Sequence, residues 1–77
     1  MFLNSKIKIV NVDGIECKKC ASKISDELNN IANVKSVKVN VDKKEVIVKY
    51  KDNLDNIEIN EAIDRLGYTV TGIRDKK

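Results

Sequence analysis

Two amphipathic helical patterns, each enclosed by strand-like patterns, constrain the fold of this 77-residue chain most strongly. Both place apolar residues three or four positions apart. The stripes consist of Ala21, Ile24, Leu28 and Ile31 in a helix from Lys18 to Ile31, and of Ile59, Ala62, Ile63 and Leu66 in a second helix. A chain this short must bury the apolar stripes of both helices in one core. We expect a single α+β domain over residues 1–77, a ferredoxin-like βαββαβ sandwich whose four-stranded antiparallel sheet carries two helices on one face.

Alternating residues predict the four strands, which we place at residues 6–12, 36–41, 46–50 and 68–74. The polar link Asp42-Lys43-Lys44 is short enough to join the middle two strands as a hairpin. In the first strand Val10 and Val12 share one face while Ile7 and Ile9 share the other. Either both faces of this strand are partly covered, or a bulge shifts its phase.

Helix caps and chain ends set the expected limits of the domain. Asp55 or Asn56 is suited to cap the second helix, and Gly67 stands where a helix C-terminus favours a left-handed residue. We expect the domain core to span about residues 5–74. Residues 1–4 should form a loose lead-in, and residues 75–77 should fray.

One face of the sheet should lie open, because both helices cover the other. The alternation of the strands indicates apolar residues on this open face, namely Ile7, Ile9, Ile47 and Ile73. Single exposed apolar residues are normal and predict no binding site by themselves. Tyr50 is in phase with Val46 and Val48 and should face the helices, so the open face offers no aromatic platform for stacking RNA bases. Nucleic-acid binding is therefore not expected.

The only two cysteines, Cys17 and Cys20, lie where the first strand gives way to the first helix. Residues three apart at a helix start share one side, so both sulfurs can point the same way. The unpaired N–H groups and the dipole of a helix N-terminus favour an anionic sulfur. Positive charge follows nearby on Lys18, Lys19 and Lys23. Each of these features should lower the thiol pKa, and the thiolate is the form that binds metal or attacks.

Composition restricts where such a pair of thiols would act. The sequence contains no His, and 15 Lys and Arg against 12 Asp and Glu give a net charge of only +3. The start of the chain lacks the apolar run of a signal peptide, and no stretch approaches the roughly 18 apolar residues of a membrane span. We expect a cytoplasmic domain without membrane insertion. In a reducing compartment, C-x-x-C is typical of a metal-binding or catalytic site rather than of a structural disulfide.

Three segments resemble the heavy-metal-associated domain, which occurs in small copper chaperones and in the N-terminal modules of metal-transporting P-type ATPases. Gly14-Ile15-Glu16-Cys17-Lys18-Lys19-Cys20 is similar to the family's metal-binding motif. Residues 34–41 resemble its second strand, and residues 62–68 resemble its second helix with the Gly-Tyr that follows. The resemblance covers about residues 5–74.

The resemblance implies roles for individual residues. Cys17 and Cys20 would be the metal ligands, and Tyr68 would shield the metal site as an accessory residue. Ile15 replaces the family's usual Met, an apolar core residue whose role Ile can fill. Glu16 stands where Thr or Ser is common, whereas zinc- and cadmium-type relatives often carry Asp there. Glu16 is therefore a candidate accessory ligand.

The metal can be argued from the ligand set. Two thiolates without an imidazole suit a soft ion that accepts few sulfur ligands, so Cu(I) is favoured. A divalent ion such as Zn(II) or Cd(II), or else mercury, is the alternative. Zinc prefers four ligands and would need Glu16, with or without Asp13, plus water or another molecule. An incomplete two-sulfur site suits delivery, because a partner's C-x-x-C can add its sulfurs before the first pair lets go.

The implied partner is a metal-transporting P-type ATPase or a metal-responsive regulator. The sequence leaves open whether the chain is a free chaperone or a regulatory module of a longer transporter. We expect a monomer without metal, and whether metal bridges two copies is also left open. A thiol–disulfide oxidoreductase is the distant alternative, but thioredoxin-like proteins need a cis-proline beside the site and this chain has no proline. We therefore predict a protein that is not an enzyme.

Overall fold

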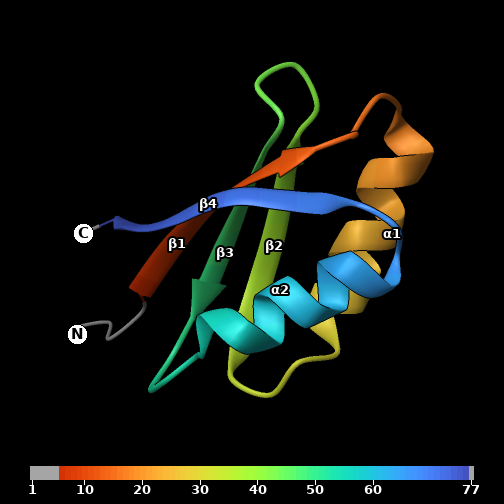
Figure 1. The fold of residues 1–77 in the computed structure, drawn as a ribbon. Helices are drawn as coiled ribbons and strands as arrows, with labels where there is room; N and C mark the ends of the chain where they lie inside the picture. The colour runs from red at the N-terminus through yellow and green to blue at the C-terminus, as the bar shows by residue number, and fades with distance from the viewer. Residues whose placement is uncertain (1–5, 77) are drawn as a thin grey trace.

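The computed structural model describes residues 6–76, and these form two helices and one sheet (Figure 1). The elements follow the order predicted from the sequence, βαββαβ. They are β1 (Lys6–Asp13), α1 (Lys18–Asn29), β2 (Val34–Asn40), β3 (Glu45–Tyr50), α2 (Asn56–Arg65) and β4 (Thr69–Lys76). Strand β1 pairs antiparallel with β3 on one side and with β4 on the other.

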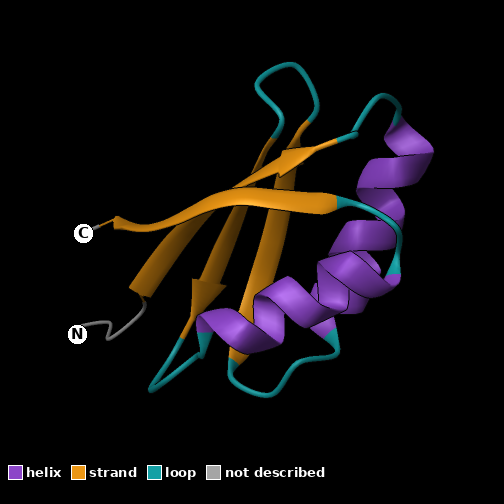
Figure 2. Cartoon of the chain, in the orientation of Figure 1, coloured by secondary structure: helices purple, strands orange, loops and turns teal. Residues whose placement is uncertain are grey.

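The sheet has the strand order β2-β3-β1-β4, so β1 and β3 are its central strands. Each neighbouring pair is antiparallel. Figure 2 shows both helices in one layer against the sheet. The predicted ferredoxin-like sandwich is therefore confirmed.

The core lies between the sheet and the helices. It contains the stripe residues Ile24 and Leu28 of α1 and Ile59, Ala62 and Ile63 of α2, all with no exposed surface. The alternate residues of the central strands face them, namely Val10, Val12, Val46, Val48 and Tyr50. Tyr50 thus faces the helices as predicted.

The ambiguity of the first strand has a definite answer. Val10 and Val12 face the core, whereas Ile7 and Ile9 lie half-buried on the open face. A register shift between Asn11 and Val12 marks a bulge in the pairing with β4. The placement of Ile73 on the open face was wrong: Ile73 pairs with Val10 and packs against the core, because the bulge changes the phase of β4.

Several predicted boundaries also need correction. Helix α1 ends at Asn29, and Ile31 follows the helix while still packing on the core. Asp55 is the N-cap residue of α2, but its side chain makes no cap hydrogen bond. Tyr68 precedes β4 rather than starting it. The expected lead-in at residues 1–4 and the last residue, Lys77, lie outside the described residues.

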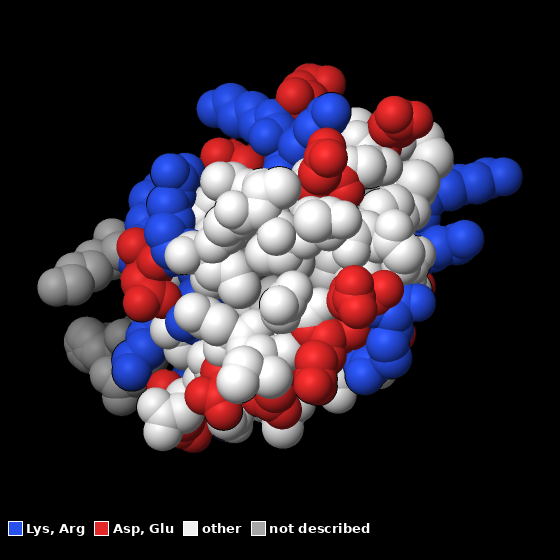
Figure 3. All heavy atoms as spheres, viewed as in Figure 1, with Lys and Arg blue, Asp and Glu red and all other residues white. Residues whose placement is uncertain are grey.

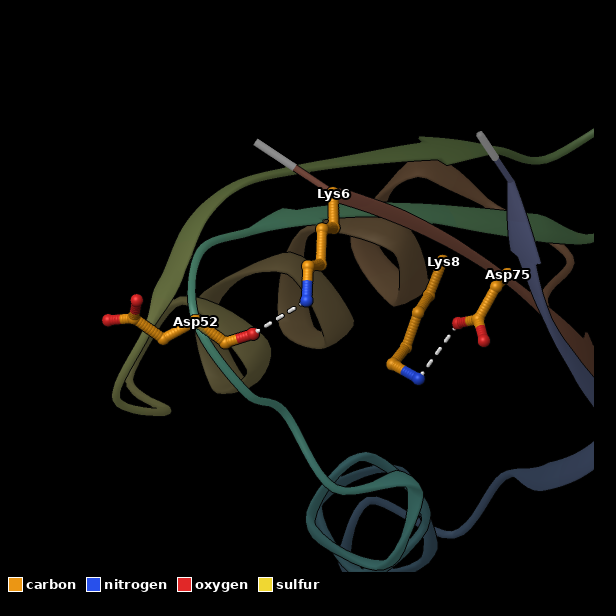
Figure 4. A network of polar contacts seen from close by, with 4 residues as sticks. All are labelled: Lys6, Lys8, Asp52 and Asp75. Atoms are coloured by element: carbon orange, nitrogen blue, oxygen red, sulfur yellow. Dashed lines mark hydrogen bonds and ion pairs between the residues drawn. The ribbon is translucent and has the colours of Figure 1, made fainter. Parts of the chain in front are cut away.

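The predicted fraying after Arg74 was wrong for Asp75 and Lys76, which continue β4. Lys76 pairs with Ile7, and Asp75 pairs with Lys8 in the β1–β4 ladder. Lys8 is the one buried charged side chain among residues 6–76, at 7% exposure. Its Nζ donates to Asp75 Oδ1 at 3.0 Å and lies 5.4 Å from the centroid of the Tyr50 ring. Figure 4 shows this pair beside a second bond, from Lys6 Nζ to the carbonyl oxygen of Asp52.

Candidate metal centre

The loop between β1 and α1 is anchored by Ile15. Its side chain is 1% exposed and belongs to the core, although its neighbours Gly14 and Glu16 are exposed. Gly14 has φ +100°, a conformation that L side chains rarely adopt. The loop therefore turns at Gly14 and returns to the core at Ile15, which fills the apolar role predicted for this position.

The two cysteines lie together at the start of α1. Cys17 is the N-cap residue, and its carbonyl oxygen accepts the first helical hydrogen bond from the N–H of Ala21 at 3.1 Å. Cys20 lies in the first turn, so the two Sγ atoms are on one side of the helix, 3.3 Å apart. Both are free thiols, since this separation exceeds the roughly 2.05 Å of a disulfide. Cys17 is exposed, and Cys20 is half-buried against the core.

Tyr68 reaches the same place from the other half of the chain. At the end of α2 the N–H of Gly67 donates to the carbonyl oxygen of Asp64 and the N–H of Tyr68 to that of Ile63. With Gly67 at φ +91°, these two bonds form a Schellman motif, which confirms the left-handed residue predicted there. The motif directs the chain back toward the cysteines.

The ring of Tyr68 packs on Gly14, and its hydroxyl is placed to act as a hydrogen-bond donor toward the sulfur of Cys20. A Cβ atom at Gly14 would lie 3.2 Å from Cδ1 of Tyr68, which is closer than ordinary van der Waals contact. Gly14 is thus needed twice, for its backbone angle and for the approach of the ring. The sequence indicated only the turn; a small residue in the motif loop and an aromatic after Gly67 were the signals available for the contact.

These contacts lower the pKa of the Cys20 thiol from 9.0 to about 7. The main cause is the hydrogen bond from the Tyr68 hydroxyl, followed by the one from Cys17 and by backbone N–H groups of Glu16 and Cys17. The same contact raises the pKa of Tyr68, because ionising its hydroxyl would remove the donor that Cys20 needs. The nearby lysines, which the sequence suggested as a cause, do not contribute to this shift.

A groove of about 530 Å³ has Cys17 in its lining. Glu16, Cys17 and Lys18 line one side, and residues 38–42 with Ile47 line the other. Within residues 6–76, no group of three or more His, Cys, Asp or Glu side chains is arranged to hold a metal ion. The structure therefore brings Cys17, Cys20 and Tyr68 together but does not add Glu16 or Asp13 to them.

The model of the heavy-metal-associated domain family matches residues 9–69, which include the motif loop, both cysteines and Tyr68. This chain belongs to the heavy-metal-associated domain family. The copper chaperone CopZ of Staphylococcus aureus (strain bovine RF122 / ET3-1) is 38% identical over 64 residues, which cover 82% of this chain and 94% of that protein. The copper chaperone CopZ of Enterococcus hirae is 37% identical over 59 residues, covering 75% and 86%.

Solved structures of heavy-metal-associated domains agree with this fold. A CopZ metallochaperone superimposes with a TM-score of 0.81 at 36% identity, covering 84% of this chain and 98% of that one. The Cu(I)-loaded N-terminal domain of a potential copper-translocating P-type ATPase from Bacillus subtilis gives a TM-score of 0.79 at 29% identity, covering 94% of each chain. The family and the fold expected from the sequence are both confirmed. In the described part of this heavy-metal-associated domain, no helix has the length and apolar character needed to cross a membrane.

Proposed function

We propose that this heavy-metal-associated domain binds Cu(I) through Cys17 and Cys20 and delivers it to a partner protein. One observation carries the proposal: two free sulfurs lie 3.3 Å apart at a helix start, one exposed and the other with its pKa lowered to about 7. Near neutral pH a large fraction of Cys20 is therefore already the thiolate that a soft ion requires. The naming of its relatives as copper chaperones supports this choice of ion.

Delivery follows from the incompleteness of the site. Two sulfurs form a small ligand set that leaves room for further soft ligands, and the exposure of Cys17 gives a second molecule access to the ion. Thiolates of a partner's C-x-x-C can join the ion before the first pair releases it. Tyr68 would shield the ion on the side of Cys20, where its hydroxyl already lies.

The partner we propose is a metal-transporting P-type ATPase, consistent with the similarity to an ATPase N-terminal domain. A metal-responsive regulator is the other partner that the sequence suggested. Lys18, Lys19 and Lys23 are exposed on the first turns of α1 and would approach an acidic docking face. Exchange between two cysteine pairs requires a reducing compartment, so we place the protein in the cytoplasm. We assign no catalytic step, and a monomer is the state proposed without metal.

The alternative, binding of a divalent ion such as Zn(II), has one residue in its favour, Glu16 beside Cys17. It can be tested directly. Cu(I) and Zn(II) should compete for the wild-type protein and for Glu16→Thr under reducing conditions. The proposal predicts that Cu(I) displaces Zn(II) from both proteins, because the two sulfurs carry the affinity. A preference for zinc that disappears in Glu16→Thr would overturn the assignment of Cu(I).

A further inference from the structure

The face of the sheet that the helices leave open has a regular arrangement of side chains. Cross-strand pairing defines rows that run over all four strands. Two neighbouring rows carry four cations of this face, and we call them the basic rows. They consist of Lys38, Ile47, Ile9 and Arg74 in one row and Ser36, Lys49, Ile7 and Lys76 in the other.

The basic rows contain four cations and no carboxylate. The acidic side chains of this face lie nearer the metal site, where Glu45 pairs with Asn11 in the next row and Asp13 ends β1. Glu45 also accepts from Arg74 at 3.3 Å, so one of the four cations is partly neutralised. Lys38, Lys49 and Lys76 are exposed.

Apolar side chains fill the middle of the basic rows. Ile47 and Ile9 are directly opposite each other on the two central strands, and Ile7 lies two residues before Ile9. All three are half-buried and do not belong to the core between sheet and helices. The cations stand mostly on the outer strands, so an apolar centre is flanked by positive charge on both sides.

The helix layer has the opposite character along α2. Its exposed acidic residues are Glu58, Glu61 and Asp64, preceded by Asp55 at the N-cap. Its one cation, Arg65, is paired with Glu27 of α1 at 3.1 Å. In Figure 3 acidic side chains gather in the lower half of the viewed face, over α2. The molecule is therefore polarised, with positive charge on the open sheet face and negative charge on α2.

We propose that the basic rows adsorb to the surface of a bilayer that contains anionic phospholipid. A basic surface with aliphatic side chains at its centre combines attraction to anionic headgroups with shallow apolar contact. An extended anionic surface would also orient the molecule, because it attracts the open face of the sheet and repels the acidic helix α2. Nucleic acid fits less well, because the basic rows carry no aromatic side chain for stacking.

Only one of the two basic rows borders the groove beside Cys17: Lys38 and Ile47 line that groove, whereas no residue of the other row does. The motif loop follows the far end of β1, beyond Asn11 and Asp13, and the carboxylates of the face lie on that side. Lipid headgroups bound along the row of Ser36, Lys49, Ile7 and Lys76 would therefore lie on the side of the sheet away from that groove. The inference does not depend on metal binding, and it goes beyond the proposed function by adding a surface on which the protein is held.

The test is co-sedimentation of the reduced, metal-free protein with vesicles. Vesicles of equal parts phosphatidylglycerol and phosphatidylcholine should bind it at low ionic strength, and vesicles of phosphatidylcholine alone should not. Lys49→Gln with Lys76→Gln should weaken the binding roughly 30-fold, since each cation near the surface contributes roughly a fivefold factor. Binding of the wild type should disappear at about 0.5 M salt, where the Debye length is only a few ångströms.

The matched control is Lys23→Gln with Lys43→Gln, which removes the same charge from exposed positions on α1 and in the β2–β3 turn. This variant should bind within about threefold of the wild type, because neither position belongs to the basic rows. Equal losses in the two double variants would overturn the proposal, since net charge alone would then explain the binding. Absence of binding to the anionic vesicles would overturn the proposal as well. So would a protein that binds RNA or an acidic peptide but not the vesicles.

Discussion

Two groups of polar side chains lie near the two ends of strand β1, and they differ in whether all their interaction partners lie within the chain. Near its start, the Lys8 ammonium is buried and has its partners within the chain, the Asp75 carboxylate at 3.0 Å and the ring of Tyr50. Beyond its end, the sulfurs of Cys17 and Cys20 contact each other and the Tyr68 hydroxyl, and Cys17 remains exposed. The first arrangement is satisfied internally, whereas the second can still accept a ligand.

The two ends also differ in what they share with relatives. Both cysteines lie within residues 9–69, which the family model matches, whereas Lys8 and Asp75 lie outside that range. The two cysteines, which we call the metal end, thus lie in the part of the chain shared with the family, and to them we assign metal binding. The arrangement of Lys8, Asp75 and Tyr50, which we call the closed end, lies partly outside the matched range, and we expect it to stabilise the fold. Changes at the two ends should therefore separate metal binding from folding stability.

The largest effect should come from Cys17→Ser. Loss of a ligand should weaken Cu(I) binding by more than the roughly 10- to 100-fold that removal of an outer-shell partner costs. Because Cys17 is exposed, thermal unfolding of the metal-free protein should hardly change. Competition with a chromophoric Cu(I) chelator measures the affinity, and circular dichroism measures the unfolding. Wild-type affinity in this variant would contradict the assignment of the metal end.

The closed end predicts an asymmetry between its two partners. Asp75→Asn leaves the buried Lys8 ammonium without its carboxylate and should lower the free energy of unfolding by about 1–3 kcal/mol. Lys8→Met removes the buried charge but keeps a similar volume, and should change that free energy by less than about 1 kcal/mol. Urea denaturation checks both values. Neither variant should alter Cu(I) affinity. An altered affinity would show that the two ends of β1 are energetically coupled, against our account.

Gly14 tests how the metal end is shaped. Gly14→Ala places a Cβ atom at φ +100° and 3.2 Å from the Tyr68 ring, so we expect a loss of about 1–2 kcal/mol in the free energy of unfolding. Gly72→Ala is the matched control in β4, where the new Cβ would lie 3.7 Å from the Asn11 side chain in ordinary contact. Urea denaturation should show a smaller change for Gly72→Ala. Equal changes would argue against a special requirement at Gly14.

Tyr68→Phe should raise the pKa of Cys20 from about 7 toward its ordinary 9.0, because the largest cause of the shift is removed. The folded-state pKa of Cys20 is depressed, so its contribution to stability is present above the unfolded pKa and is lost as pH falls through about 7. Metal binding should weaken over the same fall in pH, and in Tyr68→Phe this weakening should begin at higher pH. Thiolate absorbance against pH measures the shift, with Tyr50→Phe as a control. An unchanged Cys20 titration in Tyr68→Phe would disprove the assigned cause.

The smallest effect should come from Lys19→Glu, which reverses an exposed charge beside the cysteines. Transfer of Cu(I) to an acidic partner domain should slow several-fold at low salt, mainly through the association rate, with affinity for the metal unchanged. The difference should shrink as salt rises. Stopped-flow transfer kinetics test this, with Lys51→Glu in the loop after β3 as control. Identical rates for the two variants would remove the proposed docking role of the α1 lysines.

The fold followed from the sequence because the apolar periodicities of helix and strand are local properties. The stripe of Ile24 and Leu28 and the alternation of Val46 and Val48 both face the core as predicted. A bulge was predicted only as one alternative for the first strand. Its effect on the last strand depends on the pairing between the two strands, and so Ile73 was placed on the wrong face. The burial of Lys8 was missed for a related reason, because its partner Asp75 comes from the far end of the chain.

The metal end was predictable in its composition but not in its electrostatics. The spacing of Cys17 and Cys20 at a helix start was enough to bring the sulfurs together. The cause of the lowered pKa lies mainly in Tyr68, which the Schellman motif after α2 delivers to the site. A hydrogen bond between residues so far apart in sequence cannot be read from local charge, which is why the lysines were given this role instead.

The difference between the two ends of β1 can be measured in a single titration. Reduced, ¹⁵N-labelled protein is titrated with Cu(I) and followed by backbone amide chemical shifts. We predict saturation at one ion per chain or per metal-bridged pair, with large shifts for residues 14–20 and Tyr68 and almost none around Lys8 and Asp75. Absence of tight binding, or shifts as large at the closed end as at the cysteines, would contradict the account.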